Sequence, residues 1–305
     1  MKSILERIKN GEILVADGAM GTMLFARGLK PGEPPESVNL KNPEILEEIA
    51  QAYLDARADI IQTNTFGASP LKLSDYGLED KAEEINRIAV ERVRKVVGEK
   101  AYVSGSCGPS GKLLNPFGDT EPGEIYKSFE RQIKSLIEAG IDIICIETMT
   151  DLNEATLAIK AAKSISPEMP IMTTMTFDET PRGFYTIMGV SINDAVTGLQ
   201  KAGADIIGSN CGNGIENMII IAREFKKFSR LPIIIQSNAG LPGLKNGEIF
   251  YSETPEFFRE KAKDLINAGV SIIGGCCGTT PEHIQSIRKV VDNYKENGCK
   301  GNGLF

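Results

Sequence analysis

Three cysteines carry the clearest chemical signal in the sequence. Cys276 and Cys277 are adjacent and follow the apolar run at residues 270–273, and Cys211 follows another apolar run at residues 206–209. Three thiolates with one open position are the form of a catalytic zinc site, and soft thiolates favour zinc over magnesium or manganese. Two other interpretations stay open: buried small hydrophobic residues, or a redox pair, although a disulfide between adjacent cysteines would be strained.

The cysteine pair needs a particular backbone shape to act on one ion. Neighbouring residues of an extended strand point to opposite faces, so both sulfurs reach one ion only if the chain bends between them. Glycines stand on both sides of the pair, at Gly275 and Gly278, and glycine tolerates such a bend. Thr280 then suits the N-cap of a helix, and Pro281 suits its first position. The pattern predicts a strand, a turn that carries two thiols, and a helix.

The rest of the chain repeats a unit of a short apolar run and a longer amphipathic one. The apolar runs cover residues 13–16, 60–63, 101–104, 143–146, 171–175, 206–209, 233–236 and 271–274, and helical spacing covers residues 43–56, 81–97, 124–139, 153–165, 192–202, 215–228, 255–268 and 281–294. Runs this apolar are typical of parallel strands buried on both faces. Eight such units predict an α/β fold, a single (β/α)8 TIM barrel over residues 1–296 with a flexible C-terminal tail at residues 297–305. A doubly wound open sheet is the alternative, but its GxGxxG or phosphate-loop signature is absent from the sequence.

Barrels of this kind carry their chemistry at the carboxyl ends of the strands. The residues at these positions are Asp17, Thr63 to Phe66, Cys107, Glu147, Phe177, Cys211, Asn238, Cys276 and Cys277. The ends of the sixth and eighth strands should lie roughly 10 Å apart, at ~5 Å per strand, and side chains can span that gap. Spacing alone does not make the cysteine pattern a specific metal motif.

Composition excludes several classes of protein. The 305 residues carry a net charge of -7 without a basic cluster, so we expect no nucleic-acid partner. No apolar run approaches the ~20 residues of a membrane helix, and the N-terminus lacks the apolar core of a signal peptide. The six cysteines are then expected to be reduced thiols of a cytoplasmic protein. The single histidine, His283, argues against a Ser-His-Asp or Cys-His hydrolase, and we expect it to cap a helix rather than bind metal.

The remaining cysteines are given structural interpretations. We expect Cys107 to be a packing residue, Cys145 to lie in the core and Cys299 to lie on the tail. The segment at residues 115–119 follows the third strand and could form part of a lid over a pocket, although an ordinary surface loop is the alternative.

A series of motifs occurs in a fixed order along the chain. They are DGAMGT at residues 17–22, DIIQTNTFG at 59–67, GPSG at 108–111, ET at 147–148, SNCG at 209–212, NAG at 238–240 and GGCCGTTPEH at 274–283. In order and spacing they resemble the homocysteine S-methyltransferase family, over about residues 13–290. The first two motifs look more like the homocysteine module of cobalamin-dependent methionine synthase than like the branches that use S-methylmethionine or betaine.

The resemblance implies a barrel that holds zinc through Cys211, Cys276 and Cys277 and binds L-homocysteine beside it. A free thiol has a pKa near 8.5, and a bound zinc deprotonates a coordinated thiol. It further implies transfer of a methyl group from a methyl-corrinoid (cobalamin) protein to form L-methionine. One barrel has no room for the folate and cobalamin modules of the full enzyme, so the methyl group should arrive on a separate protein or as a small molecule. The motifs at residues 17–22 and 63–66 favour a methyl-corrinoid protein. The alternatives are a small-molecule donor such as S-methylmethionine or betaine, another thiol or selenol as acceptor, and a non-catalytic barrel that binds zinc or a thiol.

Two acidic residues are candidates for binding the ammonium group of the substrate. Glu147 ends a very apolar strand, where a charge needs a partner, and an ion pair with a lysine or arginine of the rim is the alternative. Asp17 ends the first strand and could share the ammonium or order the following loop, although capping the turn is nearly as good an explanation.

The turn after Asp17 is the candidate site for the substrate carboxylate. Gly18, Ala19, Met20 and Thr22 lie where a strand turns into a helix, and their backbone N–H groups suit an anion. A plain tight turn is the alternative. Asn238 could hydrogen-bond the substrate or orient a metal ligand, or it could simply form a turn.

Overall fold

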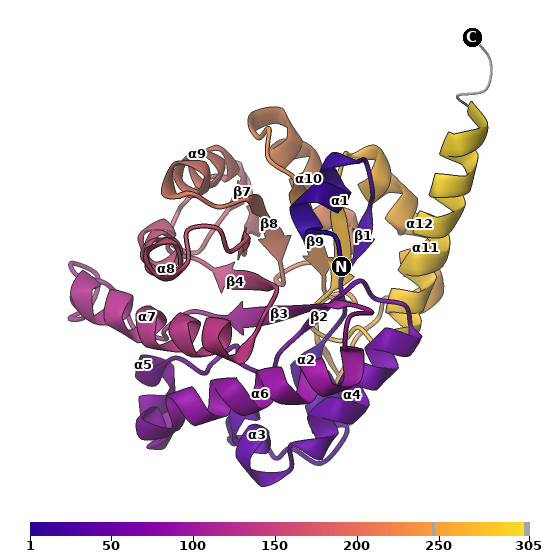
Figure 1. Cartoon of the computed structure of the whole chain (residues 1–305). Coiled ribbons are helices and arrows are strands. Elements are labelled where there is room, and N and C mark those ends of the chain that lie inside the picture. The colour runs from indigo at the N-terminus through magenta and orange to yellow at the C-terminus, as the bar shows by residue number, and fades with distance from the viewer. Residues whose placement is uncertain (246–247, 302–305) are drawn as a thin grey trace.

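The computed structural model describes the backbone of residues 1–245 and 248–301 and is built around a ring of parallel strands (Figure 1). The strands of the ring are β1 Leu14–Val15, β2 Ile60–Gln62, β3 Tyr102–Cys107, β4 Ile143–Met149, β5 Ile171–Met175, β8 Ile206–Asn210, β9 Ile233–Ser237 and β12 Ile272–Gly275. They pair in the order β1-β12-β9-β8-β5-β4-β3-β2. A bridge between Ala16 and Ile60 joins the two ends of this order. The predicted TIM barrel is confirmed.

Helices surround the ring of strands (Figure 1). The eight predicted helices are α4 Glu44–Asp55, α6 Ala82–Val97, α7 Pro122–Ala139, α8 Leu152–Ile165, α9 Ile192–Ala202, α10 Ile215–Phe228, α11 Pro255–Asn267 and α12 Pro281–Gly301. Shorter helices are α1 Ile4–Lys9, α2 Met20–Phe25, α3 Val38–Lys41 and α5 Pro70–Leu73, with 3-10 turns η1 Pro35–Ser37, η2 Ser74–Tyr76 and η3 Glu79–Lys81. Gly140 and Gly203 end α7 and α9 in the left-handed conformation, as their positions predict.

The last helix differs from the prediction. We expected α12 to end near residue 294 and a flexible tail to begin at residue 297, but the helix continues to Gly301. Residues 302–305 of the predicted tail, and the side chain of Cys299, lie outside the described residues. Each helix in the described part of the chain is too short or too polar to span a bilayer.

Two small hairpins were not predicted. β6 Asp178–Thr180 pairs with β7 Gly183–Tyr185, and β10 Gly243–Lys245 pairs with β11 Glu248–Phe250. Both hairpins follow the carboxyl end of a barrel strand, and their three-residue strands are too short to show a periodic pattern. They add to the rim of the barrel on the side where the chemistry is expected.

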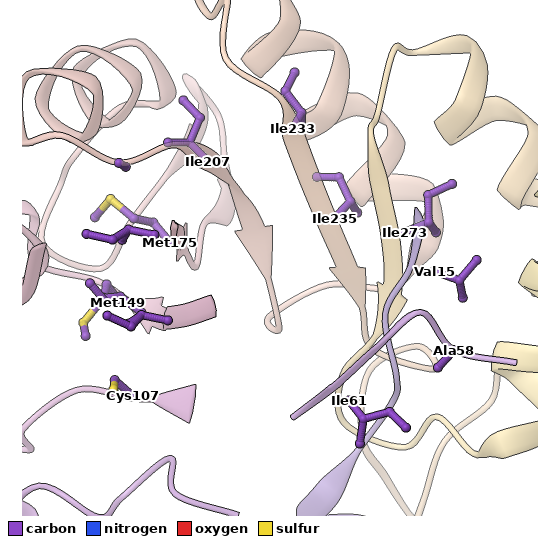
Figure 2. Packing of buried hydrophobic residues seen from close by; sticks show 14 of the residues in the cluster. Val15, Ala58, Ile61, Cys107, Met149, Met175, Ile207, Ile233, Ile235 and Ile273 are labelled. Atoms are coloured by element: carbon purple, nitrogen blue, oxygen red, sulfur yellow. The ribbon is translucent and has the colours of Figure 1, made fainter. Parts of the chain in front are cut away.

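The core has two layers because alternate strand residues face opposite ways. The inner layer fills the barrel with side chains from all eight strands, including Ile60, Met172 and Ile234, and α1 packs its Ile4 against this layer. The outer layer lies between strands and helices, where Val15 and Ile235 are found (Figure 2). One step further along the strands the inner layer becomes polar. The interior of the barrel is therefore apolar in the inner core layer and polar toward the carboxyl ends of the strands.

Candidate metal centre and active site

Cys211, Cys276 and Cys277 converge at the carboxyl end of the barrel. Their sulfur atoms all lie within 4.8 Å of one another, and the Cys211 and Cys277 sulfurs are 3.9 Å apart. A tetrahedral zinc with Zn–S bonds of ~2.3 Å holds its sulfur ligands about 3.8 Å apart. The donor set and the spacing therefore fit a zinc ion. The structure brings the three sulfurs together as the strand positions predict, while metal binding itself stays a prediction.

The backbone at both strand ends is shaped for this convergence. Cys211 has a positive φ of 59° at the end of β8, a conformation that non-glycine residues seldom adopt outside functional or tightly turned sites. At the end of β12, the Cys276 N–H donates to Ser237 O over 2.7 Å, and the chain then turns. The Thr279 hydroxyl donates to Cys276 O over 2.7 Å and fixes that turn. The predicted bend of the cysteine pair is present.

The three thiols share their protons unequally. Hydrogen bonds from the thiols of Cys276 and Cys277 lower the pKa of Cys211 to about 3. The interaction with Cys211 raises the pKa of Cys276, and it raises the pKa of Cys277 to about 11. Hydrogen bonding within the cluster therefore favours the thiolate form at Cys211 and the thiol form at Cys276 and Cys277. A bound divalent cation would stabilise all three as thiolates.

Glu147 projects into the barrel beside the cysteines and is 6% exposed. Its carboxylate accepts hydrogen bonds from the Ser106 hydroxyl and, over 3.3 Å, from the Asn210 side-chain amide. Burial raises its pKa to about 7. No lysine or arginine of the described residues contributes to that pKa, and none pairs with this carboxylate, so the alternative of an ion pair on the rim is not supported.

Asp17 lies deeper than predicted. It is 1% exposed, and burial raises its pKa to about 8, with a further contribution from Glu147. Its Oδ2 accepts from the Gln62 N–H over 2.8 Å, next to the bridge that closes the barrel. Its Oδ1 is buried without a partner among the described residues. Asp17 therefore stands behind the wall of the site and close to Glu147.

A cavity of about 380 Å³ opens over the sulfurs. It is lined by Gly18 to Thr22, Pro34 to Glu36, Gln62 to Asn64, Phe66, Gly67, Lys72, Tyr76, Ser106, Glu147, Thr148, Cys211 and Gly275 to Cys277. Eight of the residues to which the sequence analysis gave a metal-binding or substrate-binding role line it: Gly18, Ala19, Met20, Thr22, Glu147 and the three cysteines. Asp17 and Asn238 do not. The loop at residues 115–119, which could have formed part of a lid, takes no part in the lining of the pocket, so the alternative of an ordinary surface loop is favoured.

The turn after β1 is tied to the turn that carries the cysteine pair. The Ala19 N–H donates to the Thr279 hydroxyl over 3.2 Å, and the Gly278 N–H donates to the Thr22 hydroxyl over 3.1 Å. The Ala19 N–H is therefore already used and is not free for a carboxylate, contrary to our expectation for that residue. No side chain of the described residues caps α2, and the residues of its first turn, Met20 to Thr22, line the cavity.

Asn238 lies beside Cys211 rather than in the cavity wall. It is 4% exposed, and its side chain contributes to the lowered pKa of Cys211. Its own N–H donates to Asn213 O over 3.0 Å, and its Oδ1 is buried without a partner among the described residues. Of the roles considered from the sequence, this placement favours orientation of a metal ligand.

Asn210 is a site residue to which the sequence analysis gave no role. Its Nδ2 donates to the Thr148 hydroxyl over 2.7 Å, and its Oδ1 accepts from the Thr148 N–H over 2.8 Å and from the Thr174 hydroxyl over 2.7 Å. Thr148 is held at a positive φ of 60° by this pair of bonds. Asn210 thus joins the ends of β4, β5 and β8. Its place two residues beyond the inward-facing Gly208 was the signal that could have identified it.

Glu36 is a second residue that the sequence analysis missed. It is 3% exposed, it lines the cavity, and its Oε1 accepts from the Gly67 N–H over 2.6 Å. Burial raises its pKa. Its location in a short turn after two prolines shows no periodic pattern, so nothing in the sequence pointed to a buried acid there.

The other singled-out residues have structural surroundings. His283 accepts from the Thr280 N–H through Nδ1 over 3.1 Å, and its Nε2 donates to Glu253 O over 3.0 Å. The expected helix-capping role of His283 is confirmed. Cys107 and Cys145 are fully buried in the outer and inner core layers, as expected.

The chain has relatives among the methionine synthases. The chain is 33% identical over 304 residues to methionine synthase of Mycobacterium tuberculosis, covering 93% of this chain and 25% of that protein. It is 32% identical over 300 residues to methionine synthase of Mycobacterium leprae, covering 92% of this chain and 24% of that protein. The chain thus spans about a quarter of the length of these relatives.

Solved structures share the fold. The homocysteine methyltransferase MmuM from Escherichia coli, in its metallated form, superposes with a TM-score of 0.78 at 23% identity, covering 93% of this chain and 98% of that chain. Its apo form superposes with a TM-score of 0.73 at 23% identity, covering 95% and 98% of the two chains. The family model for homocysteine S-methyltransferase matches residues 14–291, nearly the whole barrel, and the chain therefore belongs to the homocysteine S-methyltransferase family.

Proposed function

We propose that this chain is a zinc-dependent methyltransferase that moves a methyl group from a methyl-corrinoid protein to L-homocysteine, forming L-methionine. The observation that carries the proposal is the cavity with three cysteine sulfurs at one end and a buried, unpaired carboxylate, Glu147, in its wall. A thiol and an ammonium group on one small molecule match these two features. Zinc bound by the three sulfurs would keep the substrate sulfur deprotonated at neutral pH.

The residues of the chain then have distinct tasks. Glu147 is positioned to bind the substrate ammonium, and the nearby Asp17 adds negative charge behind it. The uncapped first turn of α2 is positioned to bind the carboxylate. Asn238 orients Cys211. The substrate thiolate attacks the methyl carbon, so that a sulfur–carbon bond forms as the bond to the donor breaks, and the bonding electron pair leaves with the donor.

Burial explains why the acids suit an ammonium. A buried carboxylate without a cationic partner is costly to ionise, which is why the pKa values of Asp17 and Glu147 are raised. A bound ammonium supplies the missing positive charge. The acids therefore select for an amino-acid thiol over a plain thiol, because only the amino acid brings an ammonium group that offsets the cost of ionising the buried carboxylates.

Exposed apolar side chains on the rim of the barrel favour a macromolecular donor. Large apolar side chains are exposed on segments that follow the carboxyl ends of strands: Phe25, Phe66, Tyr76, Leu113, Phe117, Ile187, Leu241, Leu244, Ile249 and Phe250. Exposed apolar side chains gathered on one side of a molecule are typical of a protein–protein contact. The motifs at residues 17–22 and 59–67, and relatives that are methionine synthases about four times as long, point the same way.

A small-molecule donor is the second candidate. The cavity of about 380 Å³ is larger than one amino acid of the size of homocysteine requires, so a compact donor such as S-methylmethionine or betaine could share it. This reading leaves the exposed apolar rim without a purpose, and we favour the corrinoid protein for that reason.

A donor assay separates the candidates. Zinc-loaded protein is incubated with L-homocysteine and, in parallel, with a methylated corrinoid protein, S-methylmethionine or betaine, and methionine is measured. We expect methionine from the corrinoid protein alone, and none from the Cys211→Ser variant. Turnover with a small donor and none with the corrinoid protein would reject our choice of donor. Tight binding of zinc and homocysteine without turnover on any donor would favour a non-catalytic barrel.

A further inference from the structure

The Thr279 hydroxyl joins two turns that meet beside the cysteine cluster. It donates to Cys276 O over 2.7 Å and accepts from the Ala19 N–H over 3.2 Å. Thr279 is fully buried. Glycines make room for it, because a Cβ atom at Gly275 would lie 2.2 Å from the hydroxyl oxygen and a Cβ atom at Gly18 would lie 2.6 Å from it. The hydroxyl therefore has a fixed place between the turn of the cysteine pair and the turn after β1.

A second threonine ties the same two turns. We call residues 276–279 the cysteine turn and residues 18–22 the facing turn. The Thr22 hydroxyl accepts from the Gly278 N–H over 3.1 Å. The facing turn is also bonded to α4, since the fully buried Tyr53 donates its hydroxyl to a backbone carbonyl of this turn over 2.9 Å. Two hydrogen bonds at different positions hold the two turns in one relative arrangement.

Backbone pairing between β1 and β12 ends just before these turns. The Gly275 N–H donates to Asp17 O over 2.9 Å. Beyond that point, the hydrogen bonds between the two turns in the described part of the chain are those of the threonine hydroxyls. The cysteine turn is fixed on its other flank to the chain after β9, where the Ala239 N–H donates to Cys277 O over 2.9 Å. The separation of the two turns therefore depends on two side chains.

Both turns line the cavity over the sulfurs. All of residues 18–22 contribute to its lining, and so do Cys276 and Cys277. Under the proposed function, the substrate sulfur meets the metal at the cysteine turn while the amino-acid end lies against the facing turn. The substrate must then span a fixed gap. Such a gap discriminates by chain length, because misplacing a reacting group by about 1 Å can cost about 100-fold in rate.

We propose that Thr22 and Thr279 are positioning residues that set the length of the thiol substrate. By holding the facing turn against the cysteine turn, they select homocysteine, which has two side-chain methylene groups, over cysteine, which has one. The inference rests on the proposed function and deepens it, because it assigns residues to the choice among amino-acid thiols. In a well-fitted pocket one methylene group is worth about 10–200-fold in discrimination.

The test compares two thiols on one preparation of the whole chain loaded with cobalt(II) in place of zinc. Binding of a thiol to the metal changes the cobalt absorption spectrum, which gives a dissociation constant for L-homocysteine and one for L-cysteine. We expect wild-type protein to bind homocysteine about 10-fold more tightly or better. Thr279→Val and Thr22→Val keep the shape of the side chain and lose the hydroxyl. Each should lower that ratio about 2–10-fold, the range that one hydrogen bond represents.

The ratio separates positioning from general damage, because a loosened metal site or partial unfolding weakens the binding of both thiols alike. Thr279→Ser keeps the hydroxyl and should restore most of the wild-type ratio. Thr180→Val is the matched control. It makes the same change on the β6–β7 hairpin, where the Thr180 hydroxyl donates to Gly183 O over 2.7 Å, and it should leave the ratio unchanged.

The outcomes distinguish this inference from the proposed function. If the valine variants keep the wild-type ratio, or if wild-type protein binds both thiols equally well, the inference is wrong while the metal site stands. Thr22 is partly exposed, so Thr22→Val decides the question if the buried Thr279→Val fails to fold. If wild-type protein binds cobalt but neither thiol, the proposed function and this inference both fail.

Discussion

The side-chain amide of Asn210 donates to Glu147 Oε2 across 3.3 Å. The same nitrogen lies 3.8 Å from the Cys276 sulfur. One amide thus connects the acid that we assign to the substrate ammonium with the cluster that we assign to its thiol. Under the proposed assignment, the uncharged side chain of Asn210 would therefore set the distance between the ammonium and the sulfur of a bound amino acid.

Replacing Asn210 with alanine should affect both folding and substrate binding. The Thr148 N–H and the Thr174 hydroxyl would lose their acceptor, and buried groups left without a partner cost about 1–3 kcal/mol. We expect the free energy of unfolding in urea to fall by that amount and the KM for homocysteine to rise more than the kcat falls. Asn153→Ala, at an exposed position on α8, is the control that should change neither. An unchanged KM in Asn210→Ala would show that the amide does not position Glu147.

Loss of one sulfur should remove the metal. In the Cys211→Ser variant only two thiolates remain, and we expect zinc measured after dialysis against a chelator to fall from one ion per chain to a small fraction of that. Cys107→Ala removes a buried cysteine that faces the outer core, and it should keep its zinc although it should unfold at lower denaturant. Full zinc in Cys211→Ser would mean that the ion is held elsewhere.

The pH dependence of product binding should report on Glu147. L-Methionine carries the same ammonium and carboxylate groups as homocysteine but has no thiol proton. An ammonium binds the ionised carboxylate, and the pKa of Glu147 is raised to about 7, so the affinity for methionine should rise as the pH increases through about 7. Calorimetric titration of zinc-loaded protein between pH 6 and 8, a range that brackets the pKa of Glu147, measures the affinity for methionine.

Glu147→Gln provides the comparison for that titration. The amide keeps the shape and cannot ionise, so its affinity for methionine should be lower than that of wild type and nearly independent of pH. If wild type and Glu147→Gln show the same slope with pH, the titrating group is a different one and the assignment of the ammonium to Glu147 is wrong.

Gly18 and Gly21 form a matched pair for testing the turn after β1. A Cβ at Gly18 would lie 2.6 Å from the Thr279 hydroxyl and 2.9 Å from the Tyr53 hydroxyl, whereas a Cβ at Gly21 meets nothing within 4 Å. Overpacking typically costs about 1–3 kcal/mol, so we expect Gly18→Ala to lower the free energy of unfolding by that amount. Gly21→Ala lies in α2 and should raise it slightly, by about 0.5–1 kcal/mol. Equal stability of the two variants in thermal unfolding would contradict the tie between this turn and Thr279.

The repeating pattern of the chain was sufficient to predict the barrel. Runs such as residues 143–146 and 206–209 are buried on both faces, and only a parallel sheet covered by helices buries both. The strand positions then placed Cys211 and the Cys276–Cys277 pair on one rim, and the structure brings their sulfurs together. These features depend on local periodicity and strand order, which a sequence displays directly.

Other features of the site depend on three-dimensional register. Ser106 on β3 and Asn210 on β8 join the site because their inward-facing positions come level with Glu147 on β4. The stagger of the strands in the barrel sets that level. The β10–β11 hairpin on the rim has short strands without a periodic signal, so the sequence did not reveal it. Asp17 follows the first strand as expected, yet the closure of the barrel at Gln62 draws it behind the wall.

Helix α1 seals the amino end of the barrel, where Ile4 is buried and Leu5 and Ile8 pack against the inner core layer. Within the part of the chain that the structure describes, the sulfurs are thus approached from the opposite end alone. Under the proposed function, the amino acid and the methyl carrier would share this one entrance, so the amino acid would bind before the carrier and methionine would leave after it. The apolar packing of α1 at the amino end of the barrel would thereby impose an ordered kinetic mechanism at the carboxyl end.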